Sequence, residues 1–208
     1  MSLKTFVKVS GVNNLSDARY CAGMGVNVLG FNLDPLSEAY VLPEKFNAIR
    51  EWISGVALAA EFSLSSAQAI AQQLKSFPAF EYLQIENPHD LSQVAHLNIP
   101  LIHPVDISGF NSLERMDAYL QEYQQTVRYF LLISGSIKEP FPSFEEILSL
   151  ATKYPVLLEY GVDAENVMQL IAQTPIAGIA LRGGDEIRPG YKHFDELADV
   201  LEAIEVEE

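Results

Sequence analysis

The sequence is poor in cysteine and in basic side chains. Cys21 is the single cysteine among 208 residues, which excludes an intramolecular disulfide and any cysteine-rich metal site. The chain has 13 lysines and arginines against 28 acidic residues, for a formal net charge of -15. A surface this acidic repels phosphate backbones and anionic lipids, so nucleic acids and membranes are poor candidate partners.

Long apolar runs are missing as well. None approaches the roughly 20 residues that a helix needs to cross a bilayer. Residues 1–10 have neither a long apolar core nor a cleavage-site pattern, so we expect no signal peptide. These features predict a cytoplasmic enzyme or binding protein, a monomer or a homodimer, that takes a small-molecule ligand and uses no cofactor.

Short apolar runs alternate with amphipathic stretches along the whole chain. The apolar runs are continuous, which is typical of strands buried on both faces, and helical spacing recurs between them, as from Leu113 to Tyr123. We predict strands at 5–10, 26–31, 55–60, 80–85, 99–105, 128–133, 155–159 and 176–181.

Eight such units predict an α/β protein, a (β/α)8 TIM barrel that forms one domain over residues 1–208. An open, doubly wound sheet is the rival fold, but the expected glycine-rich first turn is missing after Ser10. Asn14 or Ser16, Ser143 and Asp163 are predicted helix N-caps, and Gly25 is a predicted helix end. The ligand site of such a barrel lies at the carboxyl ends of its strands.

Four segments carry a resemblance to a known family. Residues 8–14 read KVSGVNN, 25–32 read GVNVLGFN, 161–167 read GVDAENV and 184–192 read GDEIRPGYK. In order and spacing they resemble the phosphoribosylanthranilate isomerases, with their motifs K-I-C-G-I-T, G-F-x-F, G-G-L-N-P-E-N-V and S-G-V-E-x-x-P-G-x-K. The resemblance implies a TIM barrel from tryptophan biosynthesis that performs an Amadori rearrangement of a phosphoribosylamine.

The positions that carry this chemistry in the family differ here. The resemblance implies a cysteine base at the end of strand one, an aspartate acid at the end of strand six and a substrate-gripping arginine. This sequence has Ser10, Ile133 and Ala39 at those positions. Each lost acid or base typically costs on the order of 100- to 10,000-fold in rate. We therefore predict a pseudoenzyme that binds a small, phosphorylated or unphosphorylated metabolite.

The phosphate-binding segment is partly kept. Barrels of this kind hold phosphate on backbone N–H groups after strands seven and eight. The first glycine of the strand-seven pair is replaced by Tyr160, but Gly161 is present. Arg182, Gly183 and Gly184 follow strand eight, so we predict that these three residues and Gly161 bind phosphate.

Polar residues end many of the predicted strands. The residues concerned are Lys8, Ser10, Asn32, Glu61, Gln84, Glu86, His103, Asp106, Glu159 and Arg182. A buried charge needs a partner, so one interpretation is an ion pair of Lys8 with Glu86 or Glu159. The functional alternative is a new acid–base set at the Ser10 position, with Glu86 or Glu159 as base and Lys8 or His103 as acid.

Three hypotheses of function remain open. The first is a barrel of this family that binds a metabolite without the ancestral reaction. The second is a working isomerase in which Glu86 or Glu159 replaces the missing groups, and the third is a non-catalytic regulatory or partner protein. We expect no metal, because a site made of Glu61, Glu86, His103 and Asp106 has no ligand-spacing motif. His103 itself reads better as a hydrogen-bonded core residue, and Cys21 as a packing residue.

Overall fold

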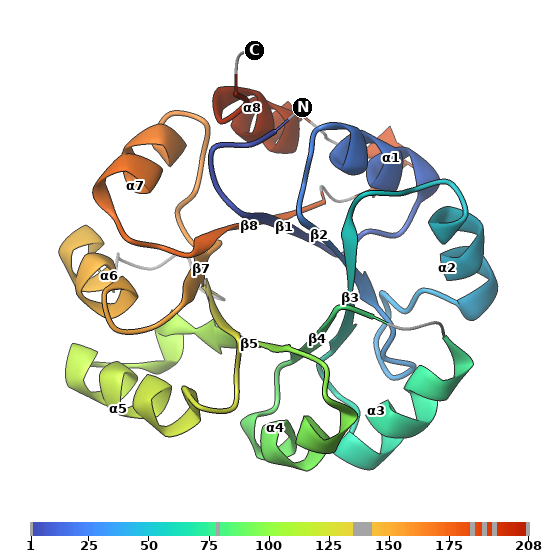
Figure 1. Ribbon diagram of the computed structural model, residues 1–208, viewed down its shortest axis with the longest axis horizontal. Helices are drawn as coiled ribbons and strands as arrows, with labels where there is room; N and C mark the ends of the chain where they lie inside the picture. The colour runs from blue at the N-terminus through green and yellow to red at the C-terminus, as the bar shows by residue number, and fades with distance from the viewer. Residues whose placement is uncertain are drawn as a thin grey trace.

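Eight parallel strands form a closed barrel in which each strand pairs with the next and β8 pairs with β1 (Figure 1). The computed structural model describes residues 2–77, 80–134, 143–183, 186–188, 191–192 and 195–206. The barrel strands are β1 (Val7–Ser10), β2 (Val28–Asn32), β3 (Ala57–Phe62), β4 (Tyr82–Ile85), β5 (Leu101–Asp106), β6 (Tyr129–Ile133), β7 (Val156–Leu158) and β8 (Gly178–Arg182). The predicted TIM barrel is therefore confirmed.

An outer ring of helices surrounds the barrel (Figure 1). In the described residues these are α1 (Leu15–Gly23), α2 (Pro43–Arg50), α3 (Ala67–Gln73), α4 (Pro88–Val94), α5 (Leu113–Tyr123), α6 (Phe144–Ala151), α7 (Val167–Gln173) and α8 (Asp195–Ala203). Short 3-10 turns are η1 (Leu74–Ser76), η2 (Ala95–Leu97) and η3 (Ile107–Gly109), and β9 (Glu186–Arg188) pairs with β10 (Tyr191–Lys192). None of the helices in the described ranges is long and apolar enough to cross a membrane.

Most of the strands begin about two residues later than predicted. The prediction included Val26, for example, which packs in the core although β2 begins at Val28. The Val26 N–H donates to the carbonyl of Cys21 in α1, so this residue joins helix to strand without entering the sheet. Burial alone does not separate such turn residues from strand residues.

The helix boundaries follow local capping chemistry. Asn14 caps α1, and Ser143 forms a reciprocal capping box with Glu146 at α6. The predicted cap at Asp163 is wrong, because α7 begins only at Val167. The Asp163 carboxylate instead accepts from the Asn166 N–H and closes the turn that precedes the helix.

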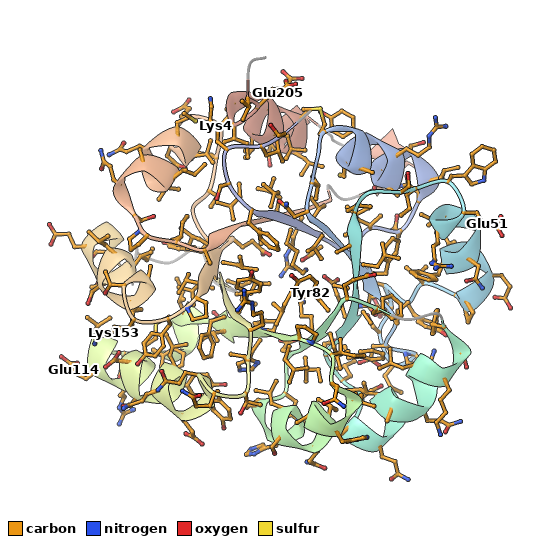
Figure 2. All side chains as sticks on the ribbon, viewed as in Figure 1. Lys4, Glu51, Tyr82, Glu114, Lys153 and Glu205 are labelled. Carbon is orange, nitrogen blue, oxygen red and sulfur yellow. The ribbon has the colours of Figure 1, made fainter. Side chains whose placement is uncertain are left out.

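The inside of the barrel changes from apolar to polar along its axis. Near the amino ends of the strands, the ring of Tyr129 lies 5.3 Å from that of Phe6 and 6.2 Å from that of Tyr82. Tyr82 points inward, whereas Glu51 and Lys153 project outward from the helix ring (Figure 2). These aromatic rings fill the amino end, so space for a ligand is left at the carboxyl end.

Asp34 joins two loops at that carboxyl end. Its carboxylate is fully buried and accepts from the backbone N–H groups of Leu36, Ser63, Leu64 and Ser65, and from the Ser65 hydroxyl. The loop after β2 is thereby held against the loop after β3. Burial raises the pKa of Asp34, but these hydrogen bonds outweigh it and hold the pKa below its ordinary value.

We expect Asp34→Asn to lower the free energy of unfolding by about 3 kcal/mol, because an amide cannot accept from all of these donors. The depressed pKa implies that the stabilisation is complete above about pH 5 and is lost as the pH falls through the lowered pKa. Urea unfolding followed by circular dichroism measures the free energy of unfolding of both proteins. The difference between wild type and Asp34→Asn should be constant near neutral pH and should become smaller in acid. The exposed variant Glu51→Gln, which removes the same charge, should show no such loss.

Candidate functional site

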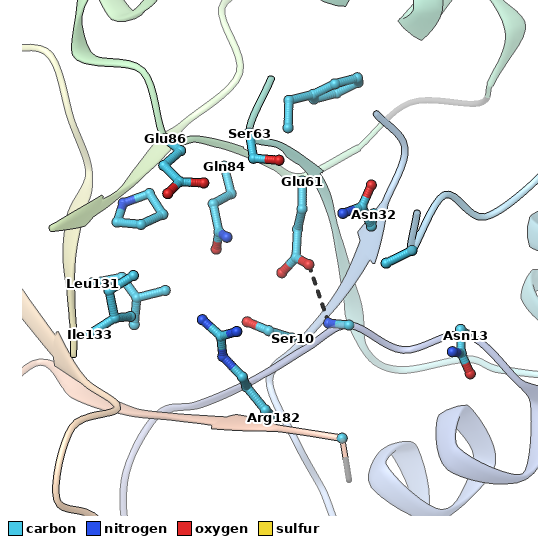
Figure 3. Close-up of a pocket in the computed structure, with 15 residues that line it drawn as sticks. Ser10, Asn13, Asn32, Glu61, Ser63, Gln84, Glu86, Leu131, Ile133 and Arg182 are labelled. Atoms are coloured by element: carbon cyan, nitrogen blue, oxygen red, sulfur yellow. Dashed lines mark hydrogen bonds between the residues drawn. The ribbon is translucent and has the colours of Figure 1, made fainter. Parts of the chain in front are cut away.

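A cavity of about 440 Å³ opens at the carboxyl ends of the strands (Figure 3). We call it the mouth cavity. Side chains two residues apart on a strand share a face, so the strand ends contribute a ring of inward-pointing groups. Its lining includes Ser10, Glu61, Gln84, Glu86, Ile133 and Arg182. The volume is within the range of about 300–1,000 Å³ that small-molecule sites occupy.

Lys8 lies directly beneath this cavity and is fully buried. Its ammonium Nζ lies 2.5 Å from Glu61 Oε1 and donates to Ser10 Oγ at 2.6 Å. The prediction that Lys8 pairs with Glu86 or Glu159 is therefore wrong. Glu61 stands on β3, which is separated from β1 only by β2, whereas Glu86 follows the more distant β4. Glu159 follows β7, which is separated from β1 only by β8, but it is paired with Arg182.

Gly30 on β2 provides the space for this ion pair. A Cβ atom at this position would lie 1.9 Å from Glu61 Oε1 and 3.0 Å from Lys8 Nζ. The other oxygen of Glu61 accepts from the Gly11 N–H at 3.2 Å. The Glu61 carboxylate is thus held by the Lys8 ammonium and the Gly11 N–H. It passes over Gly30, where a side chain would occupy the same space.

Arg182 at the end of β8 forms the second ion pair of the site. Its Nε donates to Glu159 Oε1 at 2.7 Å, while its side chain remains 66% exposed. Burial lowers the pKa of Arg182, but Glu159, with smaller contributions from Glu61 and Glu86, raises it above its ordinary value. The guanidinium is therefore surrounded by carboxylates and points into the mouth (Figure 3).

Gln84 lies on β4, and Glu86 is the first residue after the end of that strand. Both side chains point into the mouth cavity (Figure 3). The Gln84 Oε1 atom is buried and has no hydrogen-bond partner in the described part of the chain. Among the described residues, the Glu86 carboxylate makes no hydrogen bond or ion pair. The Gln84 Oε1 atom and the Glu86 carboxylate can therefore accept hydrogen bonds from a ligand in the cavity.

His103 is not part of the mouth. It is buried on the outer face of β5, where its ring nitrogens contact the Ile85 carbonyl at 2.9 Å and the Tyr119 hydroxyl at 2.7 Å. Burial lowers its pKa below the ordinary value, which favours the neutral imidazole. Its interpretation as a hydrogen-bonded core residue is confirmed. No group of three acidic, histidine or cysteine side chains that could hold a metal occurs in the described ranges.

All three replaced family positions line the mouth cavity. Ser10 and Ile133 extend from β1 and β6, and Ala39 lies in the loop after β2. Asn13 and Ser63 line the cavity as well, and the sequence analysis did not single them out. Asn13 lies in the loop after β1, where the two-residue alternation of strands gives no signal. Ser63 follows Glu61 by two residues, as Glu86 follows Gln84, so the same alternation could have identified it.

The predicted phosphate-binding residues are only partly brought together. Gly161 adopts a positive φ of 70° with open space around it, as a close backbone approach would require. The Gly183 N–H, however, donates to the Ser10 carbonyl at 3.1 Å and so already has an acceptor. Gly184 lies outside the described residues.

A second cavity of about 620 Å³ lies between the β7–α7 loop, β8 and α8. We call it the β7–β8 cavity. Arg182 is the only basic side chain among the described residues that line it. The acidic residues of its lining are Glu159, Asp163, Glu165, Glu196 and Asp199.

We expect Glu61→Gln to lower the free energy of unfolding by about 3–5 kcal/mol, because the buried Lys8 ammonium loses its counter-charge. Combining Glu61→Gln with Lys8→Met should recover most of this loss, since no charge is then buried unpaired. Urea unfolding of the two single variants and the double variant measures the coupling. Additive losses in the double variant would contradict a direct ion pair.

Comparisons with known proteins give one consistent result. The N-(5'-phosphoribosyl)anthranilate isomerase of Thermosynechococcus vestitus is 30% identical to this chain, over 94% of the chain and 87% of the relative. The enzyme of the same name from Petrotoga mobilis is 25% identical, over 95% and 96%. No family model matches the sequence.

Solved structures agree with the sequence relatives. The crystal structure of phosphoribosyl anthranilate isomerase from Thermotoga maritima superimposes with a TM-score of 0.77 at 22% identity, and covers 96% of this chain and 98% of its own. At that identity the superposition shows a common fold, and the sequence relatives show the kinship. This chain belongs to the N-(5'-phosphoribosyl)anthranilate isomerase family.

Proposed function

We propose that this chain binds a small metabolite in the mouth cavity and does not perform the isomerisation of its relatives. The observation that carries the proposal is the pair of groups at the ends of β1 and β6. Where the family has its base and its acid, Ser10 and Ile133 line the cavity. Isoleucine cannot donate a proton, and a serine hydroxyl needs a neighbouring base to become a nucleophile or a base itself.

The neighbour of Ser10 does not supply that base. The Lys8 ammonium donates to Ser10 Oγ, and it is paired with Glu61. A protonated lysine has no lone pair with which to take the hydroxyl proton. The serine is therefore held as a hydrogen-bond acceptor, which is suited to binding a ligand and not to proton abstraction.

Glu86 is the one residue that supports a second candidate function. The isomerase hypothesis needs a replacement base, and Glu159 is engaged by Arg182. Glu86 lines the mouth cavity and has no such partner in the described residues. A working isomerase would therefore depend on Glu86, although Ile133 still leaves it without an acid at the family position.

The open cavity argues for ligand binding over a purely regulatory role. A vestigial mouth would be filled by its own side chains, whereas about 440 Å³ remains open here. A relative crystallised with reduced 1-(o-carboxyphenylamino)-1-deoxyribulose 5-phosphate holds a phosphorylated ligand. In this chain the phosphate-binding role of Gly161, Arg182, Gly183 and Gly184 remains a prediction.

The decisive experiment measures turnover of phosphoribosylanthranilate by the purified protein, with the Thermotoga maritima enzyme as positive control. We expect no rate above the uncatalysed background and no rescue of a tryptophan auxotroph. Turnover near that of the control would overturn the proposal. If that turnover were lost in Glu86→Gln, the second candidate would replace it.

Restoring the two family groups together, Ser10→Cys with Ile133→Asp, should not give strong activity. The arginine position remains Ala39 and the glycine position Tyr160, so substrate is still held poorly. Single-turnover and steady-state assays of the double variant against each single variant measure this. Activity within about tenfold of the control enzyme would show that acid and base alone separate this chain from its relatives.

A further inference from the structure

We propose that the ligand of the mouth cavity carries a cationic amine and not a phosphate ester. This inference rests on the proposed function, because it assigns the chemical class of the metabolite bound there. It departs from the phosphorylated ligand that the family resemblance implies.

Among the described residues at the mouth, the formal charges do not balance. Three carboxylates, of Glu61, Glu86 and Glu159, meet two cations there, of Lys8 and Arg182. Lys8 is paired with Glu61 and Arg182 with Glu159, so Glu86 provides the uncompensated negative charge. One ligand ammonium brings the formal count to zero. A phosphate dianion adds two negative charges to a site that is already negative, in a protein of net charge -15.

The free hydrogen-bonding groups next to Glu86 are acceptors. Gln84 Oε1 is buried without a partner in the described part of the chain, and Gln84 lies two residues before Glu86, which follows the end of β4. Both side chains point into the mouth cavity (Figure 3). A buried acceptor without a donor costs about 1–3 kcal/mol, which a ligand N–H recovers. An alkylammonium has three N–H groups, enough to donate to Gln84 and Glu86 together.

The place where a phosphate would be expected is acidic. Sites of this kind in TIM barrels lie in the loops after strands seven and eight, at the β7–β8 cavity. In the described part of its lining, five carboxylates face one guanidinium, that of Arg182, which Glu159 already engages. The Gly183 N–H is also committed, since it donates to the Ser10 carbonyl. A phosphate group bound there would be repelled by these carboxylates. It would also lack the Gly183 N–H as a hydrogen-bond donor.

The experiment uses trios of metabolites that share one carbon skeleton and differ in bearing an amine, only hydroxyls or a phosphate ester. The first trio is d-glucosamine, d-glucose and d-glucose 6-phosphate, followed by trios on shorter and aromatic skeletons, all at equal ionic strength. We expect amines to raise the melting temperature of the wild-type protein by about 3–5 °C at about tenfold above Kd, because a ligand selective for the folded state stabilises it.

Two variants that each remove one negative charge locate the effect. Glu86→Gln should abolish the amine-induced shift, whereas Glu51→Gln, at the exposed end of α2, should leave it unchanged. Glu86 is solvent-exposed in the free protein, and a bound amine would cover it. Isothermal titration of the most stabilising amine should therefore show at least a tenfold weaker Kd for Glu86→Gln, because the covered ammonium then loses its counter-charge.

The proposal is overturned if the phosphate esters stabilise the protein more than the amines do. It is equally overturned if Glu86→Gln keeps the amine shift, or if no amine in the set produces one. Failure of the proposed function is a separate result, because it appears as turnover of phosphoribosylanthranilate. If a phosphate ester stabilised the protein but phosphoribosylanthranilate was not turned over, the proposed function would stand. Only the proposal of an amine ligand would then be rejected.

Discussion

The buried ion pair between Lys8 and Glu61 is the constraint on which the site depends. An ammonium that is fully shielded from water needs a counter-charge within contact distance, and Glu61 supplies it from β3. Gly30 is required on the intervening strand because any larger residue would displace the carboxylate. Ser10 completes the arrangement as a second acceptor. Four positions on three strands are thus tied to one charge in the barrel interior.

This arrangement also limits the chemistry available at the mouth. Glu61 and Ser10 line the cavity, yet both are held by hydrogen bonds from the Lys8 ammonium. Neither is therefore free to act as a strong base, and Ile133 offers no acid. In the described part of the chain, the buried oxygens without a partner at this end belong to Gln84 on β4 and to Glu159 after β7, and not to β1 and β6, where the family has its base and acid. The cavity therefore lies at the carboxyl ends of the strands, as in other TIM barrels, but Gln84 and Glu86 provide acceptors for a ligand at the end of β4.

The sequence was sufficient to predict the barrel because each strand is a continuous apolar run, as in β6, followed by a helix with a clear apolar stripe. It was also sufficient to assign His103 to the core, since it lies between the apolar Ile102 and Pro104. The partner of Lys8 could not be predicted from spacing. Which inward side chains meet depends on strand stagger and on local volume, here the volume left by Gly30. The free Gln84 oxygen is likewise a property of the three-dimensional arrangement alone.

The charges after β7 and β8 explain how one fold can change its ligand. In a barrel, the strands and the inner apolar end provide stability, whereas loop residues set what is bound, so these regions can change independently. The carboxylates of Asp163 and Glu165 stand on the β7–α7 loop, and those of Glu196 and Asp199 on α8. None of them belongs to the barrel wall. Substitutions at these four positions can therefore change the charge of the β7–β8 cavity without disturbing the Lys8–Glu61 pair. In the amine proposal, Glu86 is the charge that selects the ligand.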